Sequence, residues 1–524
     1  MKYTAITIGP IIDTLNSARK TRELWGASYL FSFIIRKTVE ELKNNNINIL
    51  LPFYINDSEW NNNLGAGLFP DRIFVEGEID IQKNYFEPVR NKIADQIFNW
   101  LDSKKLKRSI ILDEIKKYLE NYIRFIQVQF ECQGDENIIE IGTTLLDSKE
   151  LQTKINPENN FVEKENPLFF FLYHVNGSFL FRDGFKNTRK RFPSLIEIAS
   201  SEFEYTQDYQ IIKSNIEKFL TQSEDLNTEK SEGKDEEEEI IELLKNTFGK
   251  EFRQVHKYVA IVQADGDKIG QMVTKVGTKP VEIQNFSQKL MEFSRKATDI
   301  VVNYGGSPVY MGGDDLFFFA PLVYVKENSR THILEIVKEL NIKFEDIVKS
   351  YAKNTLHISD SDLPSLSFGI SLSYYKFPLY EARNLAFDAL FEEIKWADKR
   401  NAINLKFRKH SGQIMELFVN KKQSVLWDNT IRFISENLDT KADFLNSFTQ
   451  KLRLQEDVLF EKIVKDNNKL TFFFKNNFNE NYNQYKKFYE NLANFIQVLD
   501  KNSTGIKPKE YLYSVLRFIH FLRS

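Results

Sequence analysis

Two short acidic motifs hold the residues of this sequence that are best suited to chemistry. Residues 265–267 read Asp-Gly-Asp after an apolar run, and residues 312–315 read Gly-Gly-Asp-Asp between two apolar runs. Carboxylates gathered in one place repel one another unless a cation lies between them, and such oxygen ligands suit Mg²⁺ or Mn²⁺. Two ions of this kind align a ribose hydroxyl with an α-phosphate and neutralise the leaving pyrophosphate. The motifs therefore predict a two-metal site for a nucleotide.

The residues of the two motifs have separate predicted roles. Asp265, Asp314 and Asp315 are the predicted catalytic residues and the ligands of the two metal ions. Asp267 shares a face with Asp265 only while its strand stays regular, and this strand is ending. Glycines have no Cβ, so those of the second motif let the backbone adopt positive φ and come close to a nucleotide. The predicted nucleotide-binding residues are Gly266, Asp267, Gly312, Gly313, Lys395 and Lys399.

Each motif alone also has a simpler interpretation. A Gly-Gly-Asp-Asp string is often a polar turn without catalytic function. The first motif resembles the start of an EF-hand loop, with Gly270 at the sixth position, but Val276 stands at the twelfth, where a bidentate Glu is needed. Lys395 and Lys399 fit a solvated helix face as well as a contact with a triphosphate. Only the two motifs together, in the right structural frame, favour catalysis.

Apolar periodicity predicts the elements that must position these acids. Their order, β-α-β-β-α-β, is that of a ferredoxin-like unit with a hairpin at the second motif. The first strand of such a sheet pairs antiparallel with the third, so Asp265 should lie beside Asp314 and Asp315. The predicted elements are strand 258–264, helix 286–301, strands 309–311 and 316–320, helix 332–351 and strand 366–373.

The rest of the chain is predicted in less detail. A charged stretch at 221–239 is typical of a linker or an exposed helix start. Basic residues between 182 and 191 fit contacts with a nucleic-acid backbone, although the lack of alternating aromatic residues favours a solvated loop. The segment from 413 onward is predicted to be mostly helical. The further predicted elements are strand 3–8, helix 23–42, strand 49–51, helix 110–125, a strand-like run at 168–173, helix 378–397 and strand 402–407.

Composition sets the broad class of the protein. The chain has 524 residues, of which 42% are hydrophobic, so several packed cores are expected. Its 71 basic and 74 acidic residues give a net charge of -3, which provides no general attraction to nucleic acid or an anionic membrane. Cys132 is the single cysteine, so neither a disulfide nor a cysteine-cluster zinc site is expected. No apolar run has membrane-spanning length, and we expect a soluble cytoplasmic protein.

At these motifs the sequence resembles the large polymerase/cyclase subunit of type III CRISPR interference complexes, in particular the Cmr-type (III-B) branch. The resemblance includes the two acidic motifs, Ser-Phe-Gly-Ile-Ser at 367–371, the following Pro-Leu-Tyr-Glu-Ala, and Arg-Phe-Pro at 191–193. It also includes Arg-Glu-Leu-Trp-Gly-Ala-Ser-Tyr-Leu at 22–30 and Phe-Pro-Asp-Arg at 69–72, which look like the first palm of that family.

The resemblance implies an architecture. In the family two palm domains face each other across a pair of ATP molecules, and the first palm lacks catalytic carboxylates; here Gly9 and Pro10 follow its first strand. We therefore predict an α+β protein with two ferredoxin-like palm domains, helical domains and a C-terminal helical bundle. The predicted domains are a first, non-catalytic palm at 1–87, a mixed helical and linker region at 88–250, the catalytic palm at 251–412 and a C-terminal helical domain at 413–524. In one alternative the first palm extends into the middle region.

The resemblance also implies a function and partners. It points to RNA-activated synthesis of cyclic oligoadenylate from ATP with two Mg²⁺ or Mn²⁺ ions, within a complex that holds guide RNA, target RNA and other subunits. The alternative product is AMP joined to S-adenosylmethionine, because both reactions attack an ATP α-phosphate. A third alternative is a non-catalytic scaffold. Many relatives carry a histidine-aspartate nuclease domain, but no His-Asp pair stands in this sequence, so DNA cleavage is not expected.

Overall fold

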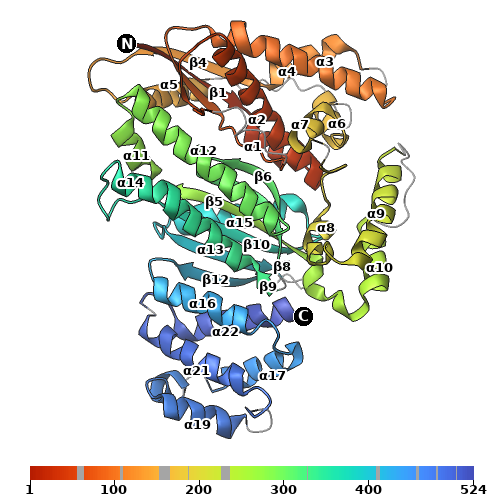
Figure 1. Ribbon diagram of the computed structural model, residues 1–524, viewed down its shortest axis with the longest axis vertical. Coiled ribbons are helices and arrows are strands. Elements are labelled where there is room, and N and C mark those ends of the chain that lie inside the picture. The colour runs from red at the N-terminus through yellow and green to blue at the C-terminus, as the bar shows by residue number, and fades with distance from the viewer. Residues whose placement is uncertain are drawn as a thin grey trace.

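The computed structural model describes most of the chain. Its described residues are 1–55, 64–106, 110–152, 166–186, 188–225, 236–326, 329–408, 414–455, 459–478, 482–502 and 504–524. The middle of the predicted linker, 226–235, lies outside them. Figure 1 shows an N-terminal sheet with its helices, a second sheet at the centre and a group of helices at the C-terminal end. The mixed α+β class predicted from the sequence is confirmed.

The central sheet contains the predicted β-α-β-β-α-β unit. Its order is β12-β11-β10-β5-β7-β6, so the first strand of the unit, β5, lies between the third, β7, and the fourth, β10. β5 pairs antiparallel with β7, and Ala264 stands opposite Leu316, as the ferredoxin-like order requires. The bounds are β5 (Tyr258–Asp267), α11 (Ile269–Val276), α12 (Pro280–Asn303), β6 (Ser307–Gly312), β7 (Asp315–Pro321), α13 (Ile333–Phe344), α14 (Ser350–Asn354) and β10 (Ser365–Tyr374).

Two further strands widen this sheet. β11 (Ala402–Arg408) pairs parallel with β10, and β12 (Ile414–Asn420) pairs antiparallel with β11. β12 falls in the segment predicted as mostly helical, because its alternating pattern is short and precedes a long helical region. A small hairpin of β8 (Val323–Lys326) and β9 (Ser329–His332) follows β7.

The N-terminal sheet repeats the same strand order. It runs β2-β3-β1-β4, so its first strand again lies between its third and fourth. Its last strand, β4, comes from the segment predicted as a mixed helical region. The bounds are β1 (Lys2–Gly9), α1 (Ile11–Asn16), α2 (Thr21–Asn44), β2 (Ile49–Leu51), β3 (Arg72–Glu76), α3 (Glu87–Ser103), α4 (Leu112–Tyr122), β4 (Arg124–Glu131) and α5 (Ile138–Gln152).

The prediction of a strand-like run at 168–173 is wrong, because these residues form helix α6 (Pro167–Tyr173). Asn166 caps the helix by accepting hydrogen bonds from the backbone N–H groups of Leu168 and Phe169, and Pro167 occupies the first helical position. A short, wholly apolar run has no period that separates a helix from a strand. The neighbouring helices are α7 (Phe179–Phe185), α8 (Leu195–Ala199), α9 (Gln207–Asp225) and α10 (Glu236–Phe248).

Helix α2 and nearby residues of the N-terminal half meet the central sheet and its helix α12 along a seam formed by backbone and side-chain hydrogen bonds. The Met311 N–H donates to the Gly67 carbonyl at 2.8 Å, and the Ser28 hydroxyl in α2 donates to the Val309 carbonyl at 3.1 Å. The Phe53 N–H donates to the Ser287 hydroxyl in α12 at 2.8 Å. Because these contacts involve both strand β6 and helix α12, the N-terminal half is fixed directly against the hairpin that carries the second acidic motif.

Helix α15 (Leu379–Leu390) covers the face of the central sheet that turns toward this seam. A Cβ on Gly369 in β10 would lie 2.2 Å from the Ala386 carbonyl, so only glycine lets the helix backbone approach this closely. The close approach brings Tyr380 and Arg383 of α15 to the cavity described below.

The C-terminal helices pack on the far side of the central sheet. The ring of Phe521 lies 4.0 Å from that of Phe407 and 4.8 Å from that of Tyr258, measured between centroids. Among the described residues, none of the helices combines the length and apolarity that a membrane crossing requires. The bounds are α16 (Ser424–Glu436), α17 (Ala442–Arg453), α19 (Asn467–Asn477), α21 (Lys486–Lys501) and α22 (Pro508–Arg523).

A buried polar cluster joins the segment before α9 to the start of β5. Glu202 accepts a hydrogen bond from Arg330 Nε at 2.8 Å and one from His256 Nε2 at 2.7 Å. His256 donates from Nε2 because its Nδ1 accepts from the Arg253 N–H. Although burial acts in the opposite direction, the hydrogen bond from His256 and the charge of Arg330 lower the pKa of Glu202 to about 2.

We expect the stabilisation from Glu202 to depend on pH. A carboxyl whose folded pKa lies below its unfolded value of 4.5 stabilises the fold above pH 4.5 and loses this effect as pH falls through its folded pKa. Glu202→Gln should therefore cost roughly 3 kcal/mol at pH 7 and less at pH 3.5. Thermal unfolding midpoints across this range test this, with the exposed Glu251→Gln as control. An equal shift at every pH would contradict the assignment.

Candidate active site

The second acidic motif forms a tight hairpin between β6 and β7. Gly312 pairs with Asp315, so Gly313 and Asp314 are the two residues of the turn. Gly313 has φ +70°, which a two-residue hairpin turn of this kind requires at its first central position and which glycine adopts at no steric cost. Its N–H donates to the buried Ser294 hydroxyl of α12 at 2.7 Å, which anchors the turn on the helix.

The three predicted catalytic aspartates converge at this hairpin. The Asp314 carboxylate accepts a hydrogen bond from the Gly266 N–H, which places it against the end of β5. The Asp315 and Asp265 carboxyl groups are close enough to share a hydrogen bond when one of them is protonated. The antiparallel pairing of β5 with β7 is the reason for this convergence, because it sets the end of one strand beside the start of the other.

Crowding of these acids changes their ionisation. Desolvation and then the charge of Asp265 raise the pKa of Asp314 to about 6. The Asp315 carboxylate is open to solvent on one side, yet desolvation by the surrounding walls and the charges of Asp314 and Asp265 raise its pKa well above the usual range. Three acids at this spacing therefore lack sufficient positive charge, and a bound cation would relieve their repulsion.

Lys395 is the cation that the chain itself supplies. Its ammonium group contacts the Asp265 carboxylate and lies 2.7 Å from Asp267 Oδ1. It also donates to the carbonyls of Asp265 and Gly266, at 3.0 Å each. The side chain is 10% exposed, so these contacts are shielded from water. Lys395 is therefore held at the end of β5, and its contact with a triphosphate stays a prediction.

Asp267 lies beneath the site rather than in it. It is 2% exposed, and besides Lys395 its carboxylate accepts from the Ser365 and Ser367 hydroxyls, both at 2.7 Å, and from the Asn401 N–H at 2.9 Å. Although desolvation opposes it, the charge of Lys395 lowers the pKa of Asp267. Protein donors occupy both oxygens, so Asp267 positions the end of β5, and the expectation that it contacts a nucleotide has no support in its surroundings.

Two other predicted nucleotide-binding residues, Lys399 and Gly312, contact other groups in the structure. Lys399 is exposed, and within the described residues its ammonium group contacts the Phe418 ring, 5.5 Å from the centroid, and none of the three aspartates. A Cβ on Gly312 would lie 2.1 Å from the Tyr310 hydroxyl. The lack of a side chain at Gly312 therefore makes room for Tyr310, whereas Gly266 and Gly313 bring backbone next to the acids.

The carboxylates at this site are suitable ligands for hard divalent cations, although they do not form a preorganised coordination site. In the described part of the chain, no three His, Cys, Asp or Glu side chains are already arranged to hold one ion. The carboxylate oxygens are nonetheless of the type that Mg²⁺ and Mn²⁺ bind, and the raised pKa values of Asp314 and Asp315 indicate missing positive charge. Lys395 has Asp267 and two carbonyls as further partners, so Asp265 can turn to a metal without leaving the ammonium group unpaired.

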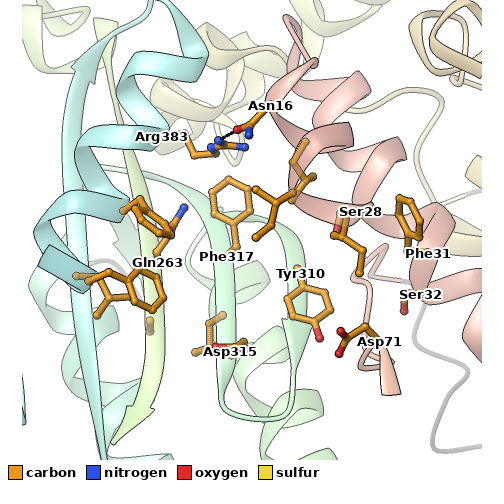
Figure 2. A pocket seen from close by; sticks show the side chains of 18 of the residues that line it. Asn16, Ser28, Phe31, Ser32, Asp71, Gln263, Tyr310, Asp315, Phe317 and Arg383 are labelled. Atoms are coloured by element: carbon orange, nitrogen blue, oxygen red, sulfur yellow. Dashed lines mark hydrogen bonds between the residues drawn. The ribbon is translucent and has the colours of Figure 1, made fainter. Parts of the chain in front are cut away.

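A cavity of about 620 Å³ opens beside Asp315, between the central sheet and the helices of the N-terminal half. Figure 2 shows Asp315, Asp71 and Tyr310 at one end and Arg383 with Asn16 at the other. One wall comes from β5, β7 and α15, and the other from α1, α2 and the residues before β3. The volume suits a nucleotide-sized ligand, and the carboxylates at one end and Arg383 at the other give the cavity electrostatic polarity.

Several lining residues carry no signal in the sequence that would mark them as functional. Asp71 precedes β3 as Asp315 begins β7, so the third strand of each sheet carries an acid at the seam. Its carboxylate accepts from the Thr7 hydroxyl at 3.3 Å, and desolvation raises its pKa. Arg383 hydrogen-bonds Asn16 across the cavity. The shared strand order of the two sheets is the one feature that would have indicated Asp71 as a site residue.

Gly266→Ala should lower the metal-dependent turnover expected of this site at least about tenfold, without unfolding the protein. Its new Cβ would lie 2.4 Å from Asp314 Oδ2 and 2.6 Å from Ile269, so Asp314 must move. Gly270→Ala is the matched control, because a Cβ there meets nothing within 4 Å. Turnover assays and thermal unfolding of both variants check this, and equal activity of the two would contradict the close approach of Asp314 to Gly266.

The fold and these acids together define a palm domain, with a ferredoxin-like sheet, an acidic hairpin between its second and third strands and an acid at the end of the first. Residues 258–404 match the model of the Cas10/Cmr2 second palm domain, and residues 3–103 match that of the N-terminal region of the CRISPR-associated protein Cmr2. These two segments of the chain are therefore similar to the second palm domain and the N-terminal region of Cas10/Cmr2 proteins.

Individual proteins are similar to parts of the chain. The CRISPR system Cmr subunit Cmr2 of Pyrococcus furiosus is 26% identical over 241 residues, which cover 41% of this chain and 25% of that protein. The chain thus matches about a quarter of that relative's length. Among solved structures, the apo Type III-B Cmr-beta chain has a TM-score of 0.47 at 12% identity, covering 80% of this chain and 70% of its own. Csm1 of T. onnurineus has a TM-score of 0.49 at 13% identity, covering 100% of this chain and 69% of its own.

Proposed function

We propose that the protein is a nucleotidyltransferase that uses ATP, with Asp265, Asp314 and Asp315 as the metal ligands. The single observation that carries this is the convergence of three carboxylates, two of them with raised pKa values, beside a nucleotide-sized cavity between the N-terminal half and the central sheet. When bound, two divalent ions would activate a ribose hydroxyl and neutralise the departing pyrophosphate.

The chain's own residues have roles that follow from their contacts. Gly266 and Gly313 keep backbone close to the acids, and Ser294 holds the turn in place. Lys395 and Asp267 lock the end of β5, which orients Asp265. Arg383, at the opposite end of the cavity, is suited to the polar part of a second ligand. The site is thus rigid where the acids lie and open where an acceptor would enter.

Cyclic oligoadenylate is the product that we propose first, with AMP joined to S-adenosylmethionine as the alternative. Both reactions break the same α–β phosphate bond of ATP and release pyrophosphate, so the three aspartates serve either one. The acceptor end of the cavity, which contains Arg383, decides between a ribose hydroxyl and another nucleophile. A solved structure similar to this chain is a Csm1–Csm4 cassette in complex with cA4.

We also propose that the protein acts within an RNA-guided assembly. A similar solved chain belongs to a Type III-B Cmr-beta complex bound to cognate target RNA. The corresponding division of this chain assigns 1–87 together with β4 to a first palm, 251–412 to the catalytic palm, and 413–524 to a helical domain for partner subunits. β12, although it lies within 413–524, would then belong to the catalytic palm, because it pairs with β11.

Product analysis tests the proposal. The protein, with and without its guide RNA complex and target RNA, is incubated with ATP and Mg²⁺ or Mn²⁺, in the presence and absence of S-adenosylmethionine. Mass spectrometry should find adenylate oligomers or an adenylated acceptor only when metal is present. A scaffold is the competing function, and it predicts neither product nor metal-dependent ATP binding by calorimetry.

A further inference from the structure

A glutamine side chain without a protein partner lies on the β5 wall of the cavity beside Asp315. Gln263 lines this cavity between Asp315 and Arg383 (Figure 2). The residue is half-buried, and its carboxamide makes no hydrogen bond to any residue that the structure describes. An amide that is drawn away from water gains stability only when it finds a new partner. The donor and the acceptor of this carboxamide are therefore available to a ligand.

Strand alternation explains why the carboxamide reaches the cavity. Alternate residues of a strand share one face of the sheet, so Gln263 lies on the same face of β5 as Ile261 and Asp265. Ile261 is fully buried, whereas Gln263 and Asp265 are half-buried. Along this face the chain therefore passes from the core to the cavity and then to the acids.

Aromatic side chains border the carboxamide on two sides. Toward β7, Gln263 stands opposite Phe317, whose ring also lines the cavity (Figure 2). Toward β10, it stands opposite Gly369, over which helix α15 packs closely. Phe387 in α15 and Phe391 just after it line the cavity from that helix, and their ring centroids are 4.5 Å apart. Aromatic residues from two different elements thus flank one unpaired amide.

We propose that Gln263 is a specificity-determining residue that hydrogen-bonds the adenine base of the bound nucleotide. Phe317 and the two rings that follow from α15 supply apolar surface against which the base packs. This inference rests on the proposed function, because it assigns the base of the nucleotide that the same cavity would hold. The cavity is partly open to solvent, which lets a ligand enter.

The chemistry of a carboxamide matches adenine. Its oxygen accepts from the N6 amino group, and its nitrogen donates to the adjacent N7, which is the pairing that glutamine makes with adenine. Guanine presents two acceptors, N7 and O6, at the same edge, so the oxygen of Gln263 would face an acceptor there. Stacking on aromatic rings is open to every base, because every base has a flat face. The rings therefore supply affinity and the carboxamide supplies selection.

Ligand-observed NMR titrations of the full chain with adenosine and purine riboside, in metal-free buffer, test the proposal. Purine riboside is adenosine without the N6 amino group. Wild type should bind adenosine at least about fivefold more tightly than purine riboside. Gln263→Leu keeps a side chain of similar size without the amide, and should bind the two nucleosides equally. Gln271→Leu makes the same change at an exposed position of α11 and should keep the wild-type preference.

Two further variants separate the rings and the acids from the carboxamide. Phe317→Leu should weaken the binding of both nucleosides and leave the preference for adenosine, because it removes a ring and no hydrogen bond. Asp314→Asn with Asp315→Asn should also keep the preference, because a nucleoside has no phosphate and needs no metal. If wild type prefers adenosine but forms no product from ATP, the catalytic proposal fails and the role of Gln263 stands.

Several results would overturn the role of Gln263. Wild type that binds no adenosine, or binds the two nucleosides equally, would show that the carboxamide selects no base. A preference that survives Gln263→Leu, or that is lost in Gln271→Leu or in the aspartate variant, would place the selection elsewhere. Unchanged affinities in Phe317→Leu would show that the base does not pack beside Gln263. Thermal unfolding of each variant confirms that the comparison is made between folded proteins.

Discussion

Asp314→Asn with Asp315→Asn is expected to lower product formation from ATP by about a thousandfold or more. The change keeps the size of both side chains but removes the charges that would hold divalent cations. Steady-state assays at saturating ATP and Mn²⁺ measure the effect. Gly313 keeps its conformation in this variant, because its contact with Ser294 involves backbone and the serine hydroxyl alone.

The same variant should fold as well as wild type or better. At pH 8 without metal, the raised pKa values of Asp314 and Asp315 penalise the folded state, because both groups lose their protons more readily in the unfolded chain. Neutral amides remove that penalty, so the thermal midpoint should not fall. Asp428→Asn with Asp443→Asn removes two exposed charges elsewhere and should leave turnover unchanged. A variant at Asp314 and Asp315 that keeps full turnover would contradict the site.

Lys395→Met should produce the second large effect, on stability and activity together. It removes the ammonium group from Asp267, which is 2% exposed, and from two carbonyls at the end of β5. Breaking a buried ion pair by removing one partner costs about 3–5 kcal/mol. We therefore expect the thermal midpoint to fall by several degrees and turnover to be lost, because Asp265 is no longer held in place.

Two comparisons give this prediction a matched control. Lys399→Met removes an exposed lysine from the same segment and should change neither property. In a background of Asp267→Asn, Lys395→Met should cost clearly less stability, because no unpaired buried charge remains. Equal unfolding midpoints for Lys395→Met and Lys399→Met would show that Lys395 does not hold the end of β5.

The convergence of Asp265, Asp314 and Asp315 could be predicted because it follows from strand order. A β-α-β-β-α-β unit has one common sheet arrangement, and in it the end of the first strand meets the start of the third. Apolar runs of ordinary length mark these strands clearly, so local pattern and topology agree. The strand order of the central sheet could therefore be predicted without knowledge of side-chain contacts.

Contacts made by residues at the ends of helices and strands could not be predicted in the same way. Lys395 was expected at a triphosphate, yet it follows α15 in a short irregular turn of helix whose direction no periodicity reveals. Asp267 is predicted to share a face with Asp265 only while its strand stays regular, and its partners Ser365 and Ser367, which belong to the fourth strand, could not be predicted from that pattern. Asp71 precedes β3, whose five residues give too short a pattern to indicate that the residue before the strand reaches the seam.

Diffraction from crystals grown with Mn²⁺ and a non-hydrolysable ATP analogue is the most direct measurement of the central claim. Anomalous peaks should lie within about 2.2 Å of carboxylate oxygens of Asp265, Asp314 and Asp315, with the analogue's phosphates beside them. Lys395 should then remain on Asp267 and the carbonyls at the end of β5. Manganese bound elsewhere, with Lys395 still paired to Asp265 and no metal at the hairpin, would contradict the account.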